Sequence, residues 1–180
     1  MRTTPSLIAS TVLVAALGAH PAHASAPRAG SIELVTPPGQ SLSITVPDLV
    51  LLGARVAGTV FNGVMGTVTV IDARPGNRNW TATVTSTNFT TGSGTGPQTI
   101  SRGNVSYWSG PTTSQTGGGT RLPGQLTAAD AVSLSVSRTA FRASKPQGTS
   151  TTSWRPTLVI TIPSSAVAGS YTGVITHSVA

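Results

Sequence analysis

The sequence predicts an all-β protein: a single antiparallel β-sandwich, Ig-like or Greek-key, with little helix. Thr, Ser, Val and Gly dominate the 180 residues, and short stretches of alternating apolar and polar residues recur between turn clusters. β-branched residues are favoured in strands, and many short alternating segments are typical of sandwiches and barrels. Helical periodicity is poor, and residues 126–131 form the only segment in which we expect a short helix.

The expected strands follow one another along the whole chain. Their ranges are 31–35, 41–46, 56–61, 66–72, 80–86, 104–108, 131–137, 157–162 and 171–179. Alternate side chains of a strand point to opposite faces of its sheet. The sets predicted to share one face are Trp154, Leu158, Ile160 and Ile162; Leu134 and Val136; and Tyr171, Ile175, His177 and Val179. Residues 90–98, 109–124 and 143–152 are rich in Gly, Ser, Thr or Pro and are expected to be loops.

The first 24 residues have the pattern of a secretory signal peptide. Arg2 precedes the apolar run "SLIASTVLVAALG", and "AHPAHASA" then offers small-residue cleavage sites. We expect cleavage after Ala24, followed by a lead-in at 25–40 and a folded domain at 41–180. The alternative is a retained anchor, although the apolar run is shorter than the roughly 20 residues that span a bilayer. No later segment is apolar enough to cross a membrane, so the protein is expected to be secreted and extracellular.

Charge and cysteine content restrict the partners. The chain has 11 basic and 4 acidic residues and no cysteine. Removal of Arg2 leaves a net charge of 10 − 4 = +6 on the mature chain. The arginines are scattered, with no basic run or helix, so no nucleic-acid partner is predicted. The charge favours an anionic cell-wall polymer, unless it serves solubility alone.

The inventory of reactive groups argues against catalysis. His20 and His23 leave with the signal peptide, so His177 is the only mature histidine. No cluster of metal ligands and no cofactor motif is present, so we expect no enzyme, no metal and no cofactor. Two enzyme interpretations stay open. One is a Ser–His–Asp hydrolase that uses His177, and the other is a glycosidase that uses two of the acids Glu33, Asp48, Asp72 and Asp130.

Asp72 stands at the end of an expected strand and before the turn "ARPGNRN". Asp side chains bond to nearby backbone amides and so fix turns. We expect Asp72 to fix this turn, with Arg74 or Arg78 as an ion-pair partner. The turn would join strands 66–72 and 80–86 as a β-hairpin.

Two segments resemble the WxL domain of Gram-positive surface proteins. "GTVTVIDARPGNRNWTATVTSTNFTT" and the later "YTGVITHSV" supply the family positions Val70, Asp72, Arg74, Trp80, Val84, Phe89, Tyr171, Ile175 and Thr176. Ala82 stands where the first W-x-L has Leu, and His177 and Val179 replace the Trp and Leu of the second. The resemblance implies an extracellular β-rich domain that associates non-covalently with the cell wall, by interaction with peptidoglycan.

Exposed aromatic rings stack on sugars, so the aromatic residues are the candidate contacts for a wall polymer. The candidates are Trp80, Tyr107, Trp108, Trp154, Tyr171 and His177. Trp80 and Trp154 have apolar neighbours two or four residues away, which favours burial. Of the adjacent pair Tyr107 and Trp108, one should be exposed. The alternative function is a structural or adhesive surface subunit that acts through protein contacts made by loops and sheet edges.

Overall fold

The computed structural model describes residues 8–16 and 41–180, and the expected strand 31–35 lies outside this part of the chain. The described residues form three sheets. Sheet A has the order β11(Arg121–Pro123), β13(Arg138–Lys145), β6(Arg78–Ser86), β16(Tyr171–Val179), β1(Ile8–Ala16) and β3(Leu49–Leu51), with β7(Phe89–Thr90) and β8(Thr99–Ile100) beside it. Sheet B has the order β10(Thr112–Thr116), β14(Ser150–Trp154), β5(Val68–Asp72) and β2(Leu42–Thr45). Sheet C has the order β12(Val132–Ser133), β9(Val105–Trp108), β15(Thr157–Thr161) and β4(Val60–Val64).

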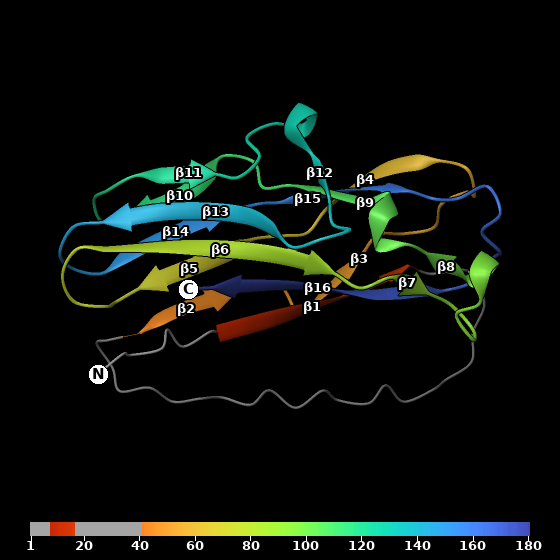
Figure 1. The fold of residues 1–180 in the computed structure, drawn as a ribbon, viewed down its shortest axis with the longest axis horizontal. Helices are drawn as coiled ribbons and strands as arrows, with labels where there is room; N and C mark the ends of the chain where they lie inside the picture. Colours follow the sequence, from red (N-terminus) through yellow and green to blue (C-terminus); the bar gives the residue numbers. More distant parts are fainter. Residues whose placement is uncertain (1–7, 17–40) are drawn as a thin grey trace.

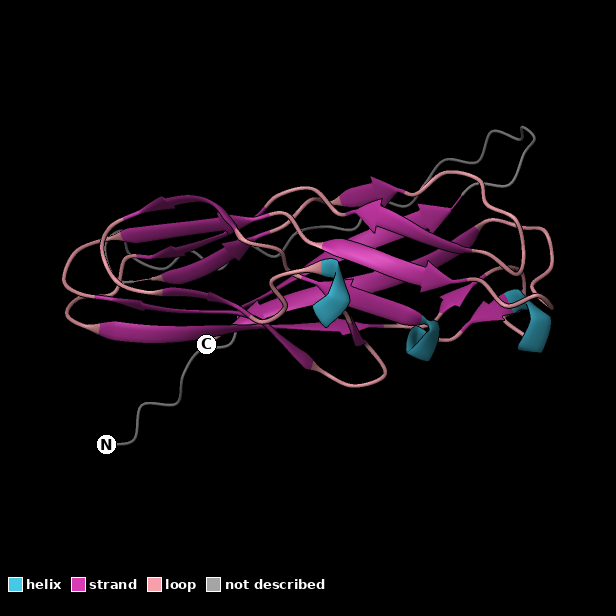
Figure 2. Ribbon diagram, turned by 90° about the horizontal axis from the view of Figure 1, so that it is seen from above, coloured by secondary structure: helices cyan, strands magenta, loops and turns pink. Residues whose placement is uncertain are grey.

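The three sheets form two layers, which confirms the predicted all-β sandwich. Sheet A is one layer, and sheets B and C together make the other (Figures 1 and 2). The strand pairs of the described residues are antiparallel except β1 with β3, which is parallel. Helical structure in this part of the chain consists of short 3₁₀ turns at Gly96–Gln98, Arg102–Asn104 and Ala128–Asp130.

The second layer is divided because three chain segments pass between sheets B and C. The passages are β4 to β5, β9 to β10 and β14 to β15. Gly66 and Gly110 have φ values of +87° and +71° at two of these breaks, a conformation that glycine adopts without steric cost. Pro156 stands at the third break and has no N–H for a ladder. Trp154 and Leu158 consequently lie in different sheets, although both face the same core as predicted.

The core lies between the two layers and centres on three aromatic rings. Phe141 of β13 stacks on Trp154 of β14 with 4.8 Å between ring centroids, and Trp80 of β6 lies 6.3 Å from Phe141 and 6.5 Å from Trp154. All three side chains are buried. Aromatic pairs contribute about 0.5–1.5 kcal/mol beyond the burial of their area, so these rings hold sheet A against sheet B.

Most apolar strands were predicted correctly, and most polar strands were missed. The expected strands at 41–46, 66–72, 80–86, 104–108, 157–162 and 171–179 are confirmed to within a few residues, whereas 56–61 is displaced to β4. The expected strand at 131–137 is reduced to β12, and the chain then turns, so Leu134 is buried while Val136 is 56% exposed. The expected loops 109–124 and 143–152 were wrong, because they contain β10, β11, the end of β13 and most of β14. The expected helix 126–131 is a single 3₁₀ turn.

The expected hairpin between residues 66–72 and 80–86 does not form. β5 pairs with β2 and β14 in sheet B, whereas β6 pairs with β13 and β16 in sheet A. Residues 73–77 therefore cross from one layer to the other. The turn is present, but it closes the end of the sandwich instead of joining neighbouring strands.

Gly124 gives a test of the sheet A edge. A Cβ built on Gly124 would lie 2.2 Å from the backbone O of Thr139, and its own N–H donates to Ala140 O at 2.9 Å. We expect Gly124→Ala to lower the free energy of unfolding by about 1–3 kcal/mol, because the backbone must shift. Gly96→Ala is the control, since its Cβ would meet nothing within 4 Å. Urea unfolding would contradict this expectation if both variants lost the same stability.

Candidate functional site

Most of the aromatic residues predicted to contact a wall polymer are inside the protein. Trp80, Tyr107, Trp154, Tyr171 and His177 are all at most 6% exposed. In this conformation they cannot stack on a polymer, so their assignment as surface contacts was wrong. The expected burial of Trp80 and Trp154 is confirmed. Trp108 is half-buried, so neither residue of the pair Tyr107 and Trp108 is exposed, contrary to the expectation; the indole Nε1 of Trp108 is buried and has no hydrogen-bond partner within the described residues.

His177 belongs to a buried hydrogen-bonded chain. Trp154 Nε1 donates to the hydroxyl of Tyr107 at 3.2 Å, and this hydroxyl lies 3.2 Å from His177 Nε2. Because an indole only donates, the Tyr107 oxygen accepts from Trp154, and the same hydroxyl forms the bond to His177. Burial lowers the pKa of His177 to about 3 and raises that of Tyr107.

His177 is buried beside Tyr107, so in this conformation it does not form the Ser–His–Asp arrangement of the first enzyme interpretation. The ring of His177 bonds through Nε2 to the hydroxyl of Tyr107, and its Nδ1 has no hydrogen-bond partner among the described residues. Asp130 instead accepts from the N–H and hydroxyl of Thr127 at 2.9 and 2.8 Å, and these bonds lower its pKa. No group of three His, Asp or Glu residues in the described part of the chain could hold a metal ion. Glu33 lies outside that part.

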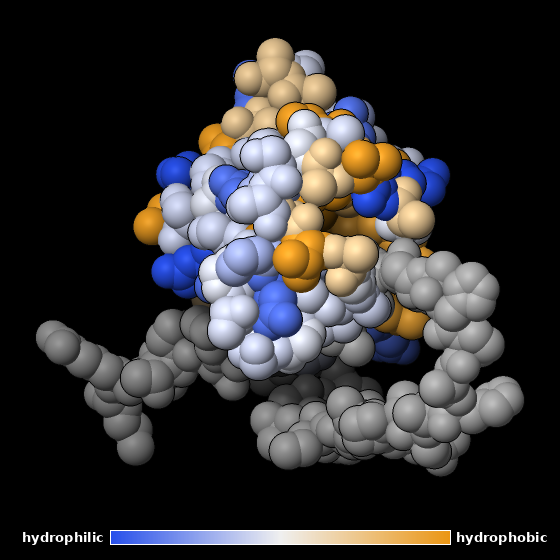
Figure 3. Space-filling view, turned by 90° about the vertical axis from the view of Figure 1, so that its right-hand side faces the viewer, coloured by the Kyte–Doolittle hydropathy of each residue, from blue (hydrophilic) through white to orange (hydrophobic). Residues whose placement is uncertain are grey.

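An apolar pocket of about 270 Å³ opens at one end of the sandwich. Figure 3 faces this end and shows hydrophobic surface inside a hollow. Its walls include Leu52, Phe61, Phe89, Ile160, Ala166 and Tyr171. Tyr171 is the one predicted contact residue that lines the pocket. At the mouth, the exposed Arg55 lies over the Phe61 ring at 4.8 Å and donates to Ala54 O at 2.7 Å. The pocket can accept an apolar group, and Arg55 has further donors for an anion.

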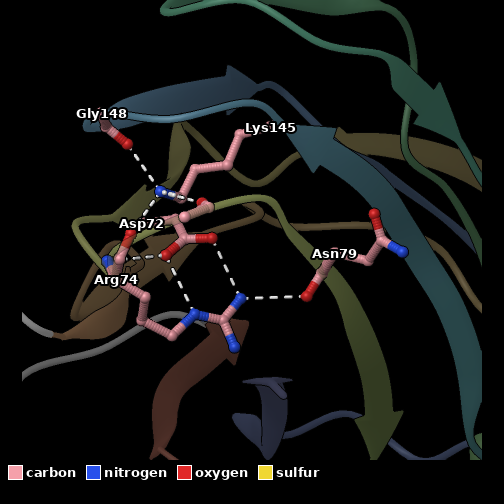
Figure 4. Close-up of polar contacts among 6 residues, drawn as sticks. Asp72, Arg74, Asn79, Lys145 and Gly148 are labelled. Carbon is pink, nitrogen blue, oxygen red and sulfur yellow. Dashed lines mark hydrogen bonds and ion pairs between the residues drawn. The ribbon is translucent and has the colours of Figure 1, made fainter.

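Polar groups converge at the turn that follows β5 (Figure 4). Asp72 is fully buried and accepts from Arg74, whose N, Nε and Nη2 lie 2.9–3.0 Å from its carboxylate oxygens. Nη2 of Arg74 also donates to Asn79 O at 2.9 Å. The expected turn and the expected ion pair of Asp72 with Arg74 are thus confirmed. The pair differs from an exposed one because its carboxylate has no access to solvent.

Lys145 connects this turn to the one between β13 and β14. Its side chain is buried, and Nζ donates to the backbone O of Arg74, to Gly148 O at 2.6 Å and to Gly76 O at 3.4 Å. Three acceptors match the three hydrogens of an ammonium group. Lys145 is therefore held by neutral carbonyls and fixes the two turns to each other. Sequence reasoning missed this role, because Lys145 fell within an expected loop.

The outer face of sheet A is lined with hydroxyl groups. β6 directs Thr81, Thr83 and Thr85 away from the core, and cross-strand pairing places Thr85 beside Thr176 and Thr83 beside Ser178 of β16. Arg142 of β13 is exposed opposite Thr81, and its guanidinium has no hydrogen-bond partner in the described part of the chain. The eight strands of sheet A contain no Asp or Glu. The signal for this face was the alternating "TATVT" of β6.

None of the three comparisons with known proteins gives a match. No protein-family model matches the sequence, and neither a curated protein nor a solved structure matches it significantly. Within the described ranges 8–16 and 41–180, no helix is long and apolar enough to cross a membrane. Function is therefore inferred from the residues and surfaces of this chain.

The buried histidine predicts a pH-dependent stability. The pKa of His177 in the folded protein is about 3, below the ordinary 6.5. The contribution of the neutral, buried ring to the free energy of unfolding is therefore complete above pH 6.5 and is lost as the pH falls toward 3. The loss is about 1.4 kcal/mol per pH unit in this window, because only the unfolded state binds the proton. We expect urea unfolding at pH 5 to show about 2 kcal/mol less acid destabilisation in His177→Gln than in the wild type. Parallel pH profiles for the two proteins would contradict this role.

Lys145 provides a second test. Replacement by Met retains much of the side-chain volume but leaves the part-buried carbonyls of Arg74, Gly76 and Gly148 without this donor. Buried unpaired polar groups cost about 1–3 kcal/mol, so thermal and urea unfolding of Lys145→Met should show a loss of that size. Arg142→Met is the matched control and should change stability by less than about 0.5 kcal/mol, since Arg142 is exposed. Equal losses in the two variants would rule out the structural role of Lys145.

Proposed function

We propose that this chain is an exported, non-catalytic surface module that associates non-covalently with an anionic cell-wall polymer, either peptidoglycan or an anionic wall glycan. The observation that carries the proposal is the outer face of sheet A. It combines paired hydroxyls with Arg142 and contains no carboxylate on any strand of the sheet. Thr85 and Arg142 on this face are exposed, so an extended polymer can reach them.

The chemistry of this face matches a wall polymer in two ways. Threonine and serine hydroxyls both donate and accept, so they can exchange hydrogen bonds with sugar hydroxyls and amides. A guanidinium binds carboxylate or phosphate with two parallel hydrogen bonds. The net charge of residues 41–180 is 9 − 3 = +6, which adds long-range attraction to polyanions. Each contact is weak because it is exposed, so binding depends on repetition along the polymer and weakens with salt.

The residues that carry the WxL resemblance stabilise the fold in this proposal and do not contact the polymer. Asp72 and Arg74 fix the turn after β5, and Trp80 packs in the core. These residues build the scaffold. We therefore assign polymer contact to the Thr, Ser and Arg side chains of sheet A, and the resemblance supports the location of the protein at the cell surface.

A second candidate function is a structural surface subunit that acts through protein contacts. One observation favours it: β1 occupies a position inside sheet A, although its residues belong to the predicted signal peptide. Loss of that peptide on export would leave two strand edges without a partner. Unpaired strand edges associate readily with other chains.

Charge-reversal variants test wall binding. We expect the mature protein to sediment with isolated cell walls at low salt and to be released at high salt. Arg142→Glu should weaken retention about three- to tenfold, because it replaces an ion pair by repulsion. Arg102→Glu is the matched control, since Arg102 is exposed on a 3₁₀ turn outside sheet A and the change in charge is the same. Failure to sediment at low salt, or equal weakening by both variants, would contradict the proposed face.

A further inference from the structure

The position of β1 has a consequence for the exported protein. β1 lies between β16 and β3 and pairs with β16 over nine residues, from Ile8 with Val179 to Ala16 with Tyr171. It also pairs in parallel with β3, from Leu13 with Leu49 to Ala15 with Leu51. All of β1 falls within the signal peptide predicted at 1–24. Cleavage after Ala24 would therefore remove an inner strand of sheet A and leave a vacant position, which we name the β16–β3 slot.

The β16 side of the slot consists of backbone groups that need a partner. Thr87 N donates to Val174 O, and Ala180 exchanges two hydrogen bonds with Thr81, so the even-numbered residues of β16 face β6. In an antiparallel ladder alternate residues direct their N–H and C=O to opposite neighbours. Gly173, Ile175 and His177 therefore direct theirs to β1. These groups flank a buried core, where unpaired backbone groups are costly.

The β3 side of the slot is anchored independently of β1. Leu52 follows β3 directly, is 7% exposed, and packs so closely on β4 that a Cβ on Gly63 would lie 2.4 Å from Leu52 Cδ2. This contact holds β3 in place from sheet C. The distance between β16 and β3 is then two interstrand spacings, or about 9–10 Å, which is the space for one strand.

We propose that the slot of the exported protein is filled by the N-terminal arm, residues 25–40, of a second copy of this chain. The arm contains the segment 31–35, "SIELV", which the sequence predicts to be a strand with Ile32 and Leu34 on one face. The occupant that the structure shows, β1, is likewise an extended, mainly apolar segment that runs antiparallel to β16. Strand addition of this kind derives its affinity from main-chain hydrogen bonds and its specificity from alternate side chains.

Chain length favours a second copy over the arm's own domain. β1 and β2 both begin at the left of Figure 1, and β1 ends at the other end of β16, beside Tyr171. Nine strand residues cover about 30 Å. If residue 35 took the place of Ala16, residues 36–41 would have to return to the start of β2, and six residues reach only about 22 Å. The arm of the same molecule could thus pair only with the Val179 end of β16. The arm of another molecule could pair along the whole strand, because no short connection to β2 limits its reach.

The resulting assembly is head-to-tail. Each molecule offers an arm at one place and a slot at another, so the contact is heterologous and leaves a free arm and a free slot at the two ends. Such contacts produce chains of subunits unless the rotation closes a ring. The inference rests on the export and cleavage included in the proposed function, and it does not depend on binding to the wall polymer.

The test compares the protein before and after cleavage. Full-length protein made without export retains β1 and should be monomeric in size-exclusion chromatography with light scattering. Exported protein should form concentration-dependent oligomers whose masses are multiples of the subunit. The double variant Ile32→Asp, Leu34→Asp should weaken association more than tenfold, because charges would enter the apolar slot. The control Ala29→Asp, Gly30→Asp adds the same charge outside the predicted strand and should leave association unchanged.

A peptide provides a measurement that does not depend on the folding of any variant. A synthetic peptide with the sequence of residues 8–16 and two added lysines should dissociate the oligomers, with one peptide bound per subunit. The same peptide N-methylated at alternate residues should not, because it cannot complete the ladder. A cleaved protein that is monomeric at all concentrations, or oligomers unaffected by the peptide or by the Ile32/Leu34 variant, would overturn the inference alone. An intact mass that retains residues 1–24 would overturn it together with the proposed export.

Discussion

Trp154 is the residue on whose contacts the arrangement of the three sheets depends. It ends β14 in sheet B, at the point where the chain leaves for sheet C, and is fully buried. Its ring stacks on Phe141 and Trp80 of sheet A, while its indole N–H donates to Tyr107 of sheet C. Tyr107 in turn bonds to His177 of sheet A. Two kinds of force, stacking and directed hydrogen bonds, therefore fix one side chain against all three sheets, and the divided second layer has a single position relative to the first.

Sequence patterns predicted the parts of this fold in which one face of a strand is apolar. β6, β15 and β16 show that alternation, and their ranges were close to the observed ones. β10 and β14 are polar strands of sheet B, and their Ser and Thr residues resemble those of loops, so composition alone could not identify them. The crossing at residues 73–77 was missed for another reason. A turn signal shows that the chain reverses or bends, but the partner strands are chosen by packing across the whole domain.

The same limit applies to the candidate sites. Asp72 and Arg74 are two residues apart, so their ion pair could be predicted from local chemistry. The buried chain of Trp154, Tyr107 and His177 joins residues far apart in sequence, and no local pattern reports that they meet. An aromatic residue serves equally well in a core and on a sugar-binding surface, which is why the predicted contacts were misplaced. The hydroxyl face of sheet A became recognisable only when pairing showed Thr83 beside Ser178 and Thr85 beside Thr176.

The place of β1 in sheet A also bears on the order of events in the life of the protein. Under the proposed export, β1 would occupy the β16–β3 slot until the signal peptide is removed. Uncleaved chains would not join one another in the proposed assembly, because β1 of each chain would occupy its own β16–β3 slot. Cleavage after Ala24, as part of the proposed export, would convert a monomer into a molecule that can polymerise. Under the proposed assembly, the moment and the place of association are set by a protease and not by the concentration of the protein.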